Sequence, residues 1–246
     1  MAERGRDDKF SQVSLILMEI FHQLGVSKNI RCIRKMNWTQ YEQLESFMLR
    51  YEIGTNISSI KVFGSQIEGS TTPGLQSDLD VVFFDKRFLA IKNLHDFVPG
   101  IENLLMVHDE DTFPAYCKLQ MLRSTQYGVI PLYAGDVNSE LDVDHQGRIV
   151  FKHSNIFKSN ERHGPAEVLT AGQSKVDIIP SIRVNSLVQE AIPWLMRHRQ
   201  YSWISRNDLE NFLKKKAFLV PVGHSLSHEK EAEWRISFTS IERKLM

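Results

Sequence analysis

The chain has 246 residues, of which 42% are hydrophobic and 24% charged, as in globular rather than disordered proteins. Thirty basic and thirty acidic residues cancel, so the overall charge does not indicate a nucleic-acid-binding protein, although a local basic patch remains compatible with it. Cys32 and Cys117 have neither metal-ligand nor disulfide-framework spacing, which favours free thiols in a reducing compartment. A charged N-terminus and the absence of a long apolar run predict no secretory signal and no membrane segment. We therefore expect a cytoplasmic protein, with the nucleus as the alternative.

Two helices are predicted before the first strand. Apolar residues recur at helical spacing over residues 8–24 and form one stripe for burial. A second helix is predicted to start near Asn37, whose side chain can cap it. Its apolar face, which we interpret as core rather than as a ligand platform, consists of Trp38, Tyr41, Leu44, Met48 and Tyr51. Residues 1–55 are thus predicted to be N-terminal helices that pack on a core domain of residues 56–246.

The strongest functional signal lies in residues 60–84. An apolar run ends at Gly64-Ser65, and a second apolar run follows Asp78. Residues two apart on a strand point to the same side, so Asp78 and Asp80 are expected to project together. Two carboxylates this close favour a divalent cation, and a Gly-Ser turn after a strand can present backbone N–H groups and a hydroxyl to a phosphate. The stretch predicts a site for Mg²⁺ and a nucleoside triphosphate.

Each part of this pattern has a simpler interpretation. Gly-Ser is a common turn, and a pair of aspartates at the start of a strand is often only a solvated loop end. The combination is more specific, because Ser65 precedes Asp78 by thirteen positions and both flank apolar strands. That order and spacing match the nucleotidyltransferase signature.

Two further acidic segments follow. Residues 108–111 (HDED) suggest a second metal site, but four consecutive polar residues cannot all face one cation, so a solvated turn is favoured. Asp177 lies within a short apolar strand over residues 175–180, where a carboxylate is costly unless it is paired or bound to a metal. An edge-strand aspartate facing water is the alternative. We prefer Asp177 as the third metal ligand.

The remaining elements are predicted from periodicity. Strands are expected at residues 116–123 and 218–222, and residues 233–242 alternate before turning helical. Helices are expected at residues 186–201 and 206–216. The region from 197 to 216 is the most basic in the chain and is typical of a solvated helix face, although it could also attract triphosphate or a nucleic-acid backbone.

Several motifs, in this order, resemble the Mab-21-like family, which includes cyclic GMP–AMP synthase and the animal cGAS-like receptors. The motifs are Gly64-Ser65, Asp78-Leu79-Asp80, and the segments 162–166 (RHGPA), 176–181 (VDIIPS), 220–224 (VPVGH) and 233–238 (EWRISF). They cover roughly residues 60–246, and the WRISF segment is the most specific of them. The Cys/His zinc insertion of the synthase has no counterpart, because this chain has only two distant cysteines.

The resemblance implies an α+β nucleotidyltransferase fold of the polymerase-β type. This is a twisted mixed β-sheet flanked by helices, and we expect its C-terminal helical lobe to be truncated at Met246. It implies that Asp78, Asp80 and Asp177 are catalytic and bind two Mg²⁺ (or Mn²⁺) ions. The nucleotide-binding residues that it implies are Gly64, Ser65, Arg235, Ser237 and Glu242.

The implied activity is metal-dependent nucleotidyl transfer. The family suggests a cGAS-like receptor that makes a cyclic dinucleotide from ATP and GTP when a double-stranded nucleic acid binds. Two alternatives stay open. One is a catalytically inactive Mab-21-like protein with a binding or regulatory role, and the other is nucleic-acid binding without catalysis through the basic region 197–216.

Overall fold

The structure of the protein is a computed structural model. It describes residues 4–23, 27–53, 58–68, 79–136, 142–157, 161–171, 174–185, 205, 207, 217–240 and 243. The predicted helices at 186–201 and 206–216, with nearly all of the basic region 197–216, lie outside these residues.

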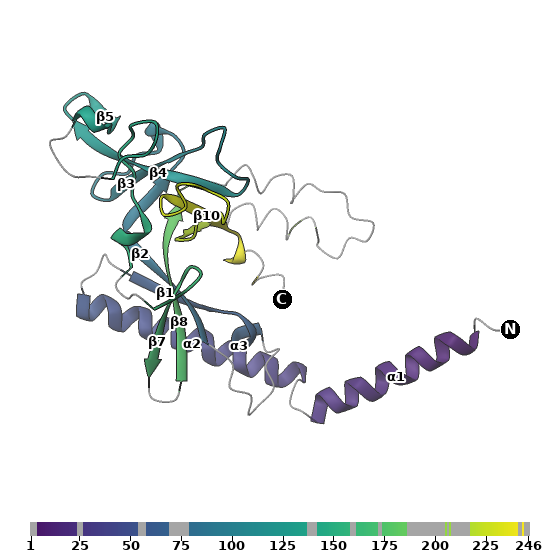
Figure 1. The fold of residues 1–246 in the computed structure, drawn as a ribbon. Helices are drawn as coiled ribbons and strands as arrows, with labels where there is room; N and C mark the ends of the chain where they lie inside the picture. Colours follow the sequence, from purple (N-terminus) through teal and green to yellow (C-terminus); the bar gives the residue numbers. More distant parts are fainter. Residues whose placement is uncertain are drawn as a thin grey trace.

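Two long helices precede the strands (Figure 1). α1 spans Arg4–Gln23, so the predicted helix is present but begins four positions before residue 8, and it extends away from the strands. α2 spans Lys28–Ile53 and begins nine positions before the predicted start at Asn37. Ser27 lies directly before α2, and its Oγ accepts a hydrogen bond from Ile30 N (3.3 Å), so Ser27 caps the helix instead of Asn37. No helix in the described ranges is long and apolar enough to cross a membrane.

The strands form one sheet that closes on itself. The strands are β1 (Ser58–Phe63), β2 (Leu79–Ile91), β3 (Glu102–Val107), β4 (Tyr116–Thr125), β5 (Gly128–Pro131), β6 (Arg162–His163), β7 (Ala166–Ala171), β8 (Ser174–Val184), β9 (Phe218–Val220) and β10 (Glu233–Ser237). The short helices are α3 (Ser65–Glu68) and the 3₁₀ turns Leu94–Asp96, Ala134–Asp136 and His153–Asn155. The path β2-β3-β4-β10-β9-β8 returns to β2 because β8 pairs with β2 in parallel.

Side-chain alternation places two apolar clusters on opposite faces of this closed sheet. The interior cluster has members from all six ring strands, among them Ala90, Leu104, Leu119, Ile182, Leu219 and Trp234. The second cluster, on the outer face, contains Phe63, Val82, Phe84, Phe218 and Val220. Leu219 is interior while its neighbours Phe218 and Val220 are on the outer face, as a strand with a period of two requires.

The predicted fold class is wrong. The described chain is mostly β, with a closed six-stranded barrel, extra strands and two long helices, rather than a twisted sheet of the polymerase-β type flanked by helices. Closure depends on β2, whose register with β8 shifts between Phe84 and Leu89. This irregularity bends the long strand, so that its first half pairs with β1 and its second half with β3 while β8 runs along its other side.

The predicted core face of α2 is also wrong. Tyr41, Leu44, Met48 and Tyr51 are 36%, 59%, 41% and 82% exposed. The face of α2 that lies against the sheet is polar instead. Ser46 Oγ accepts a hydrogen bond from Ile60 N (3.1 Å), and Glu42 Oε1 accepts one from Val62 N (2.6 Å). These bonds satisfy N–H groups on the open edge of β1, so α2 protects that edge from pairing with another strand.

Candidate functional site

Asp80 and Asp177 are brought together by the parallel pairing of β2 with β8. The two residues are direct register partners. Paired residues on neighbouring strands point to the same face, with the strands about 4.8 Å apart. Asp177 also pairs with Val168 of β7, so β8 is flanked on both sides at this position. The alternative of an edge-strand aspartate therefore does not apply to Asp177.

Gly64 packs directly against the Asp80 carboxylate of this pair. It follows β1, whose last residue Phe63 pairs with Asp80. A β-carbon at position 64 would lie 2.2 Å from Asp80 Oδ2, and the φ of Gly64 is +74°. Both the space and the backbone conformation therefore require glycine. Ser65 follows it as the half-buried first residue of α3.

A cavity of about 270 Å³ on the outer face of the sheet joins this turn to the C-terminal strand. Its lining includes Gly64, Asp80, Arg235 and Ser237, four residues that the sequence predicts for the site. They come from segments far apart in the chain. The pairing of β10 with β9, and of β9 with β8, brings Arg235 and Ser237 to this part of the outer face. Ser237 Oγ is hydrogen-bonded to Thr239 Oγ1 (2.8 Å), which also lines the cavity. Arg235 is exposed on the same face of β10.

Pro165 and Arg243 line the same cavity and were not predicted as site residues. Pro165 stands in the turn between β6 and β7, a segment recognised only as part of a motif. Arg243 directly follows the predicted residue Glu242. This adjacency is the one feature of the sequence that could have indicated Arg243 as a site residue. Its guanidinium is held by Glu42 of α2, with Nη1 bonded to Oε1 and Nη2 to Oε2 (3.2 Å), and it lies 5.7 Å from the centre of the Phe63 ring.

A second cavity, of about 680 Å³, shares Phe63, Phe218 and Arg243 with the first. Its other charged lining residues are Lys35, Glu42, Lys61 and Arg183. The two cavities together are lined by five cationic side chains and two carboxylates, namely Lys35, Lys61, Arg183, Arg235, Arg243, Asp80 and Glu42. Glu42 already accepts bonds from Val62 N and Arg243. This composition favours an anionic ligand.

Not every predicted site residue falls within the described ranges. Asp78 and Glu242 lie outside them. Asp177 is half-buried and pairs with Asp80, but it is not among the residues lining the 270 Å³ cavity. Within the described part of the chain, no group of three or more His, Cys, Asp or Glu side chains is arranged to hold a metal ion. The described residues therefore supply two of the three predicted acidic ligands.

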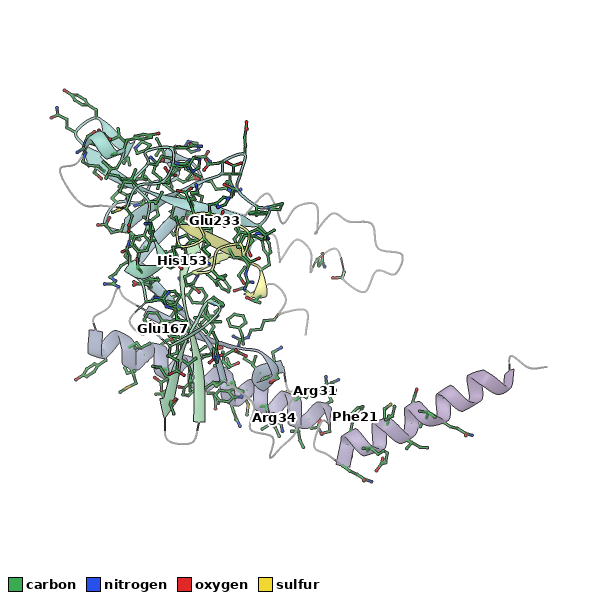
Figure 2. All side chains as sticks on the ribbon, viewed as in Figure 1. Phe21, Arg31, Arg34, His153, Glu167 and Glu233 are labelled. Carbon is green, nitrogen blue, oxygen red and sulfur yellow. The ribbon has the colours of Figure 1, made fainter. Side chains whose placement is uncertain are left out.

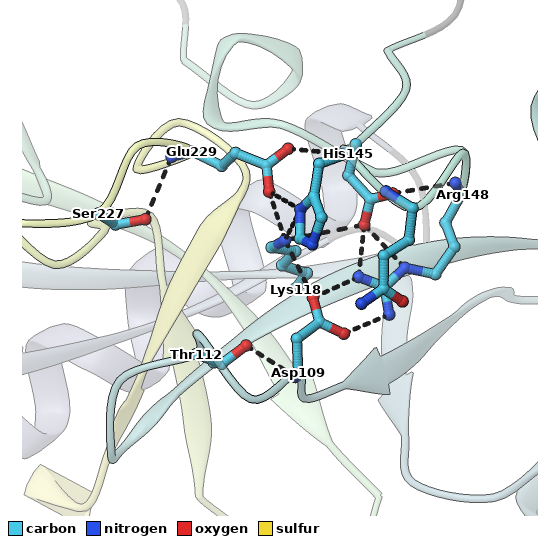
Figure 3. A network of polar contacts seen from close by, with 9 residues as sticks. Asp109, Thr112, Lys118, His145, Arg148, Ser227 and Glu229 are labelled. Carbon is cyan, nitrogen blue, oxygen red and sulfur yellow. Dashed lines mark hydrogen bonds and ion pairs between the residues drawn. The ribbon is translucent and has the colours of Figure 1, made fainter.

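A buried ionic network lies elsewhere, on the β4 side of the sheet (Figure 3). Arg148 makes a bidentate contact with Asp109 (2.8 and 2.6 Å), and Arg148 Nε donates to Asp144 Oδ2 (2.7 Å). Lys118 Nζ donates to Asp109 (3.1 Å) and to Glu229. The Asp109 side chain is only 4% exposed. The predicted solvated turn at 108–111 is thus wrong for Asp109, because cations distant in the sequence neutralise it.

Hydrogen bonds control the protonation of this network. Bonds from Arg148 lower the pKa of Asp109 to about 2, against the opposing effect of burial and with help from Lys118. Burial raises the pKa of Glu229, but bonds from Lys118 and His145 outweigh it and bring that pKa to about 2. Each buried carboxylate is paired with a cation of the network. This arrangement is typical of a structural role, here the connection of β4 to the loops before and after it.

The comparisons with known proteins do not assign the chain to a family. No family model matches it, and no curated protein matches it either. The resemblance to the Mab-21-like family therefore rests on the motifs alone.

Proposed function

We propose that the chain is a metal-dependent nucleotidyltransferase whose reaction takes place at the Asp80–Asp177 pair. The observation that carries the proposal is the register pairing of these two aspartates beside Gly64. Asp80 and Asp177 are 97 residues apart in the chain. Chain proximity therefore does not explain their pairing, and two neighbouring carboxylates are a favourable start for a divalent cation site.

The donor set suits Mg²⁺ or Mn²⁺, which prefer carboxylate oxygen. Asp80 and Asp177 would hold the cation, and Asp78, two positions before Asp80 in the sequence, would complete the set of acids. When bound, such a cation neutralises triphosphate charge and lowers the pKa of an attacking hydroxyl.

Other residues of the cavity, together with Ser65 directly after Gly64, would bind and orient the nucleotide. At Gly64 the backbone can approach a phosphate closely, because no side chain stands there. Ser65 would donate its hydroxyl to the triphosphate. Arg235 and Arg243 would attract the phosphates, and Ser237 would hydrogen-bond to the nucleotide. In the reaction a ribose hydroxyl oxygen bonds to the α-phosphorus while the bond to pyrophosphate breaks.

The finer proposal is a cGAS-like receptor that joins ATP and GTP into a cyclic dinucleotide in response to double-stranded nucleic acid. It rests on the motif resemblance, with support from the charge of α2. The first part of this helix carries Lys28, Arg31, Arg34 and Lys35 (Figure 2 labels both arginines). Clustered cations of this kind are suited to a phosphate backbone.

Product formation tests the proposal. The full chain is incubated with the four nucleoside triphosphates and Mn²⁺ or Mg²⁺, with and without double-stranded RNA or DNA. We expect a phosphatase-resistant dinucleotide and the release of pyrophosphate, both lost in Asp80→Asn. An absence of phosphodiester product under all of these conditions, or equal product from Asp80→Asn, would rule out the enzyme.

A second candidate is a protein that binds nucleotides without turnover. It is favoured by one observation, namely the excess of cationic over acidic side chains around the two cavities, which suits triphosphate binding whether or not a reaction follows. This candidate predicts metal-dependent ATP binding, measured by calorimetry, without product. Product formation would exclude it.

A further inference from the structure

The apolar face of α2 points away from the sheet. Glu42 and Ser46 face β1 and bond to it, as described above. The opposite face of the helix carries large apolar side chains that are between 41% and 82% exposed. These are Ile33, Met36, Leu44, Phe47, Met48 and Tyr51. Side chains of this kind at helical spacing are normally buried.

α1 carries a second exposed apolar face. Val13, Leu17, Ile20 and Phe21 recur at helical spacing and are between 43% and 54% exposed. Figure 1 shows α1 extending away from the strands, and Figure 2 shows Phe21 far from all of them. Within one chain, therefore, the face of α1 covers neither the sheet nor the face of α2.

We propose that a second copy of this chain covers both faces, with α1 of each copy packed along the apolar face of α2 of the other. The helices have 20 and 26 residues, so α1 can lie along most of α2. The exchange is reciprocal and obeys two-fold symmetry. It therefore closes at the dimer and leaves neither face exposed.

The exposed area is of the size that a stable dimer needs. Apolar side chains that are about half exposed leave roughly 80–100 Å² each, so the two faces together present on the order of 1,000 Å² per chain. The reciprocal contact would bury about twice that amount, compared with about 1,600 Å² for a standard protein–protein interface.

Sedimentation of the full chain over a range of concentrations tests the proposal. We expect a dimer for the wild type. Leu17→Asp on α1 and Leu44→Asp on α2 should each raise the dimer dissociation constant at least tenfold. Leu15→Asp is the matched control, because Leu15 is also exposed, at 64%, but lies about 200° around α1 from Leu17. The control should remain dimeric, and circular dichroism should find all three variants as helical as the wild type.

Mixing the two disruptive variants distinguishes reciprocal exchange from other contacts. In a heterodimer of Leu17→Asp with Leu44→Asp, one α1–α2 contact carries both charges and the other carries none. The mixture should therefore dimerise more tightly than either variant alone. A monomeric wild type, as expected if α1 folded back on its own α2, would overturn the proposal. So would a Leu17→Asp variant that dimerises like the wild type, or a mixture no tighter than its components.

Discussion

Gly64 and Asp80 are so close that no side chain fits between them. A β-carbon on Gly64 would lie 2.2 Å from Asp80 Oδ2, well inside any allowed contact distance. The turn after β1 and the carboxylate on β2 are therefore in direct contact, next to the antiparallel pairing of Phe63 with Asp80. The position of the carboxylate depends on the absence of a side chain at position 64.

Gly64→Ala should therefore disrupt the site more than the fold. We expect the affinity for ATP with Mn²⁺ to fall at least tenfold, because the new methyl group displaces the Asp80 carboxylate. Gly100→Ala is the control, since Gly100 has a similar φ of +80° but nothing within 4 Å of its β-carbon position. Both variants should lose about 1–2 kcal/mol of stability from the left-handed backbone. Equal ATP affinities, measured by calorimetry, would contradict the expectation.

Glu42 connects α2 to both β1 and Arg243. In Glu42→Gln an oxygen remains to accept the hydrogen bond from Val62 N, but the charge that holds Arg243 is lost. We expect a loss of about 1–3 kcal/mol in urea unfolding and weaker ATP binding, because Arg243 lines the cavity. Ser46→Ala removes only the bond from Ile60 N. It should destabilise the chain while leaving ATP affinity unchanged, and a matching loss of affinity would count against a role for Arg243.

Acid should weaken the buried network around Lys118 and Arg148. The pKa values of Asp109 and Glu229 are about 2 in the folded chain, below their ordinary values of 3.8 and 4.5. A carboxylate whose pKa is lowered by folding stabilises the folded chain at any pH above its ordinary pKa. That stability is lost as the pH falls toward 2. Each group contributes on the order of 2 kcal/mol.

Urea unfolding at pH 6, 5, 4 and 3 measures this loss. Asp109→Asn should be less stable than the wild type at pH 6, because Arg148 loses a charged partner. It should also show a shallower decline with falling pH, because one of the two titrating groups is absent. A decline as steep as that of the wild type would show that Asp109 does not titrate as proposed.

Local pattern was enough to predict the pieces of the site, but not their assembly into a closed sheet. Alternation indicated the strands that carry Asp80, Asp177 and Arg235, and the structure has strands at all three positions. Whether β8 pairs with β2, and whether β10 lies beside β4, depends on contacts between residues distant in the chain. The periodicity of a segment contains no information about such contacts. The predicted fold class was therefore wrong, although these three strands were predicted correctly.

The other errors arose where a distant residue changed the meaning of a local pattern. The acidic run containing Asp109 resembled a solvated turn because its partners Lys118 and Arg148 lie 9 and 39 positions away. The apolar face of α2 resembled core, yet the side that meets β1 is polar because the edge of a strand offers N–H groups that need acceptors. In both cases hydrogen-bonding requirements outweighed the hydropathy of the segment.

The central claim is that Asp80 and Asp177 share a divalent cation that holds a triphosphate. Titration calorimetry of ATP into the full chain, with Mn²⁺ and with EDTA, tests it most directly. A matched control is Glu167→Gln on β7, because Glu167 pairs with Ile178 and so faces the opposite side from Asp177. We predict binding only with Mn²⁺, lost in Asp177→Asn and kept in Glu167→Gln. ATP binding that persists in EDTA, or that Asp177→Asn leaves intact, would contradict the account.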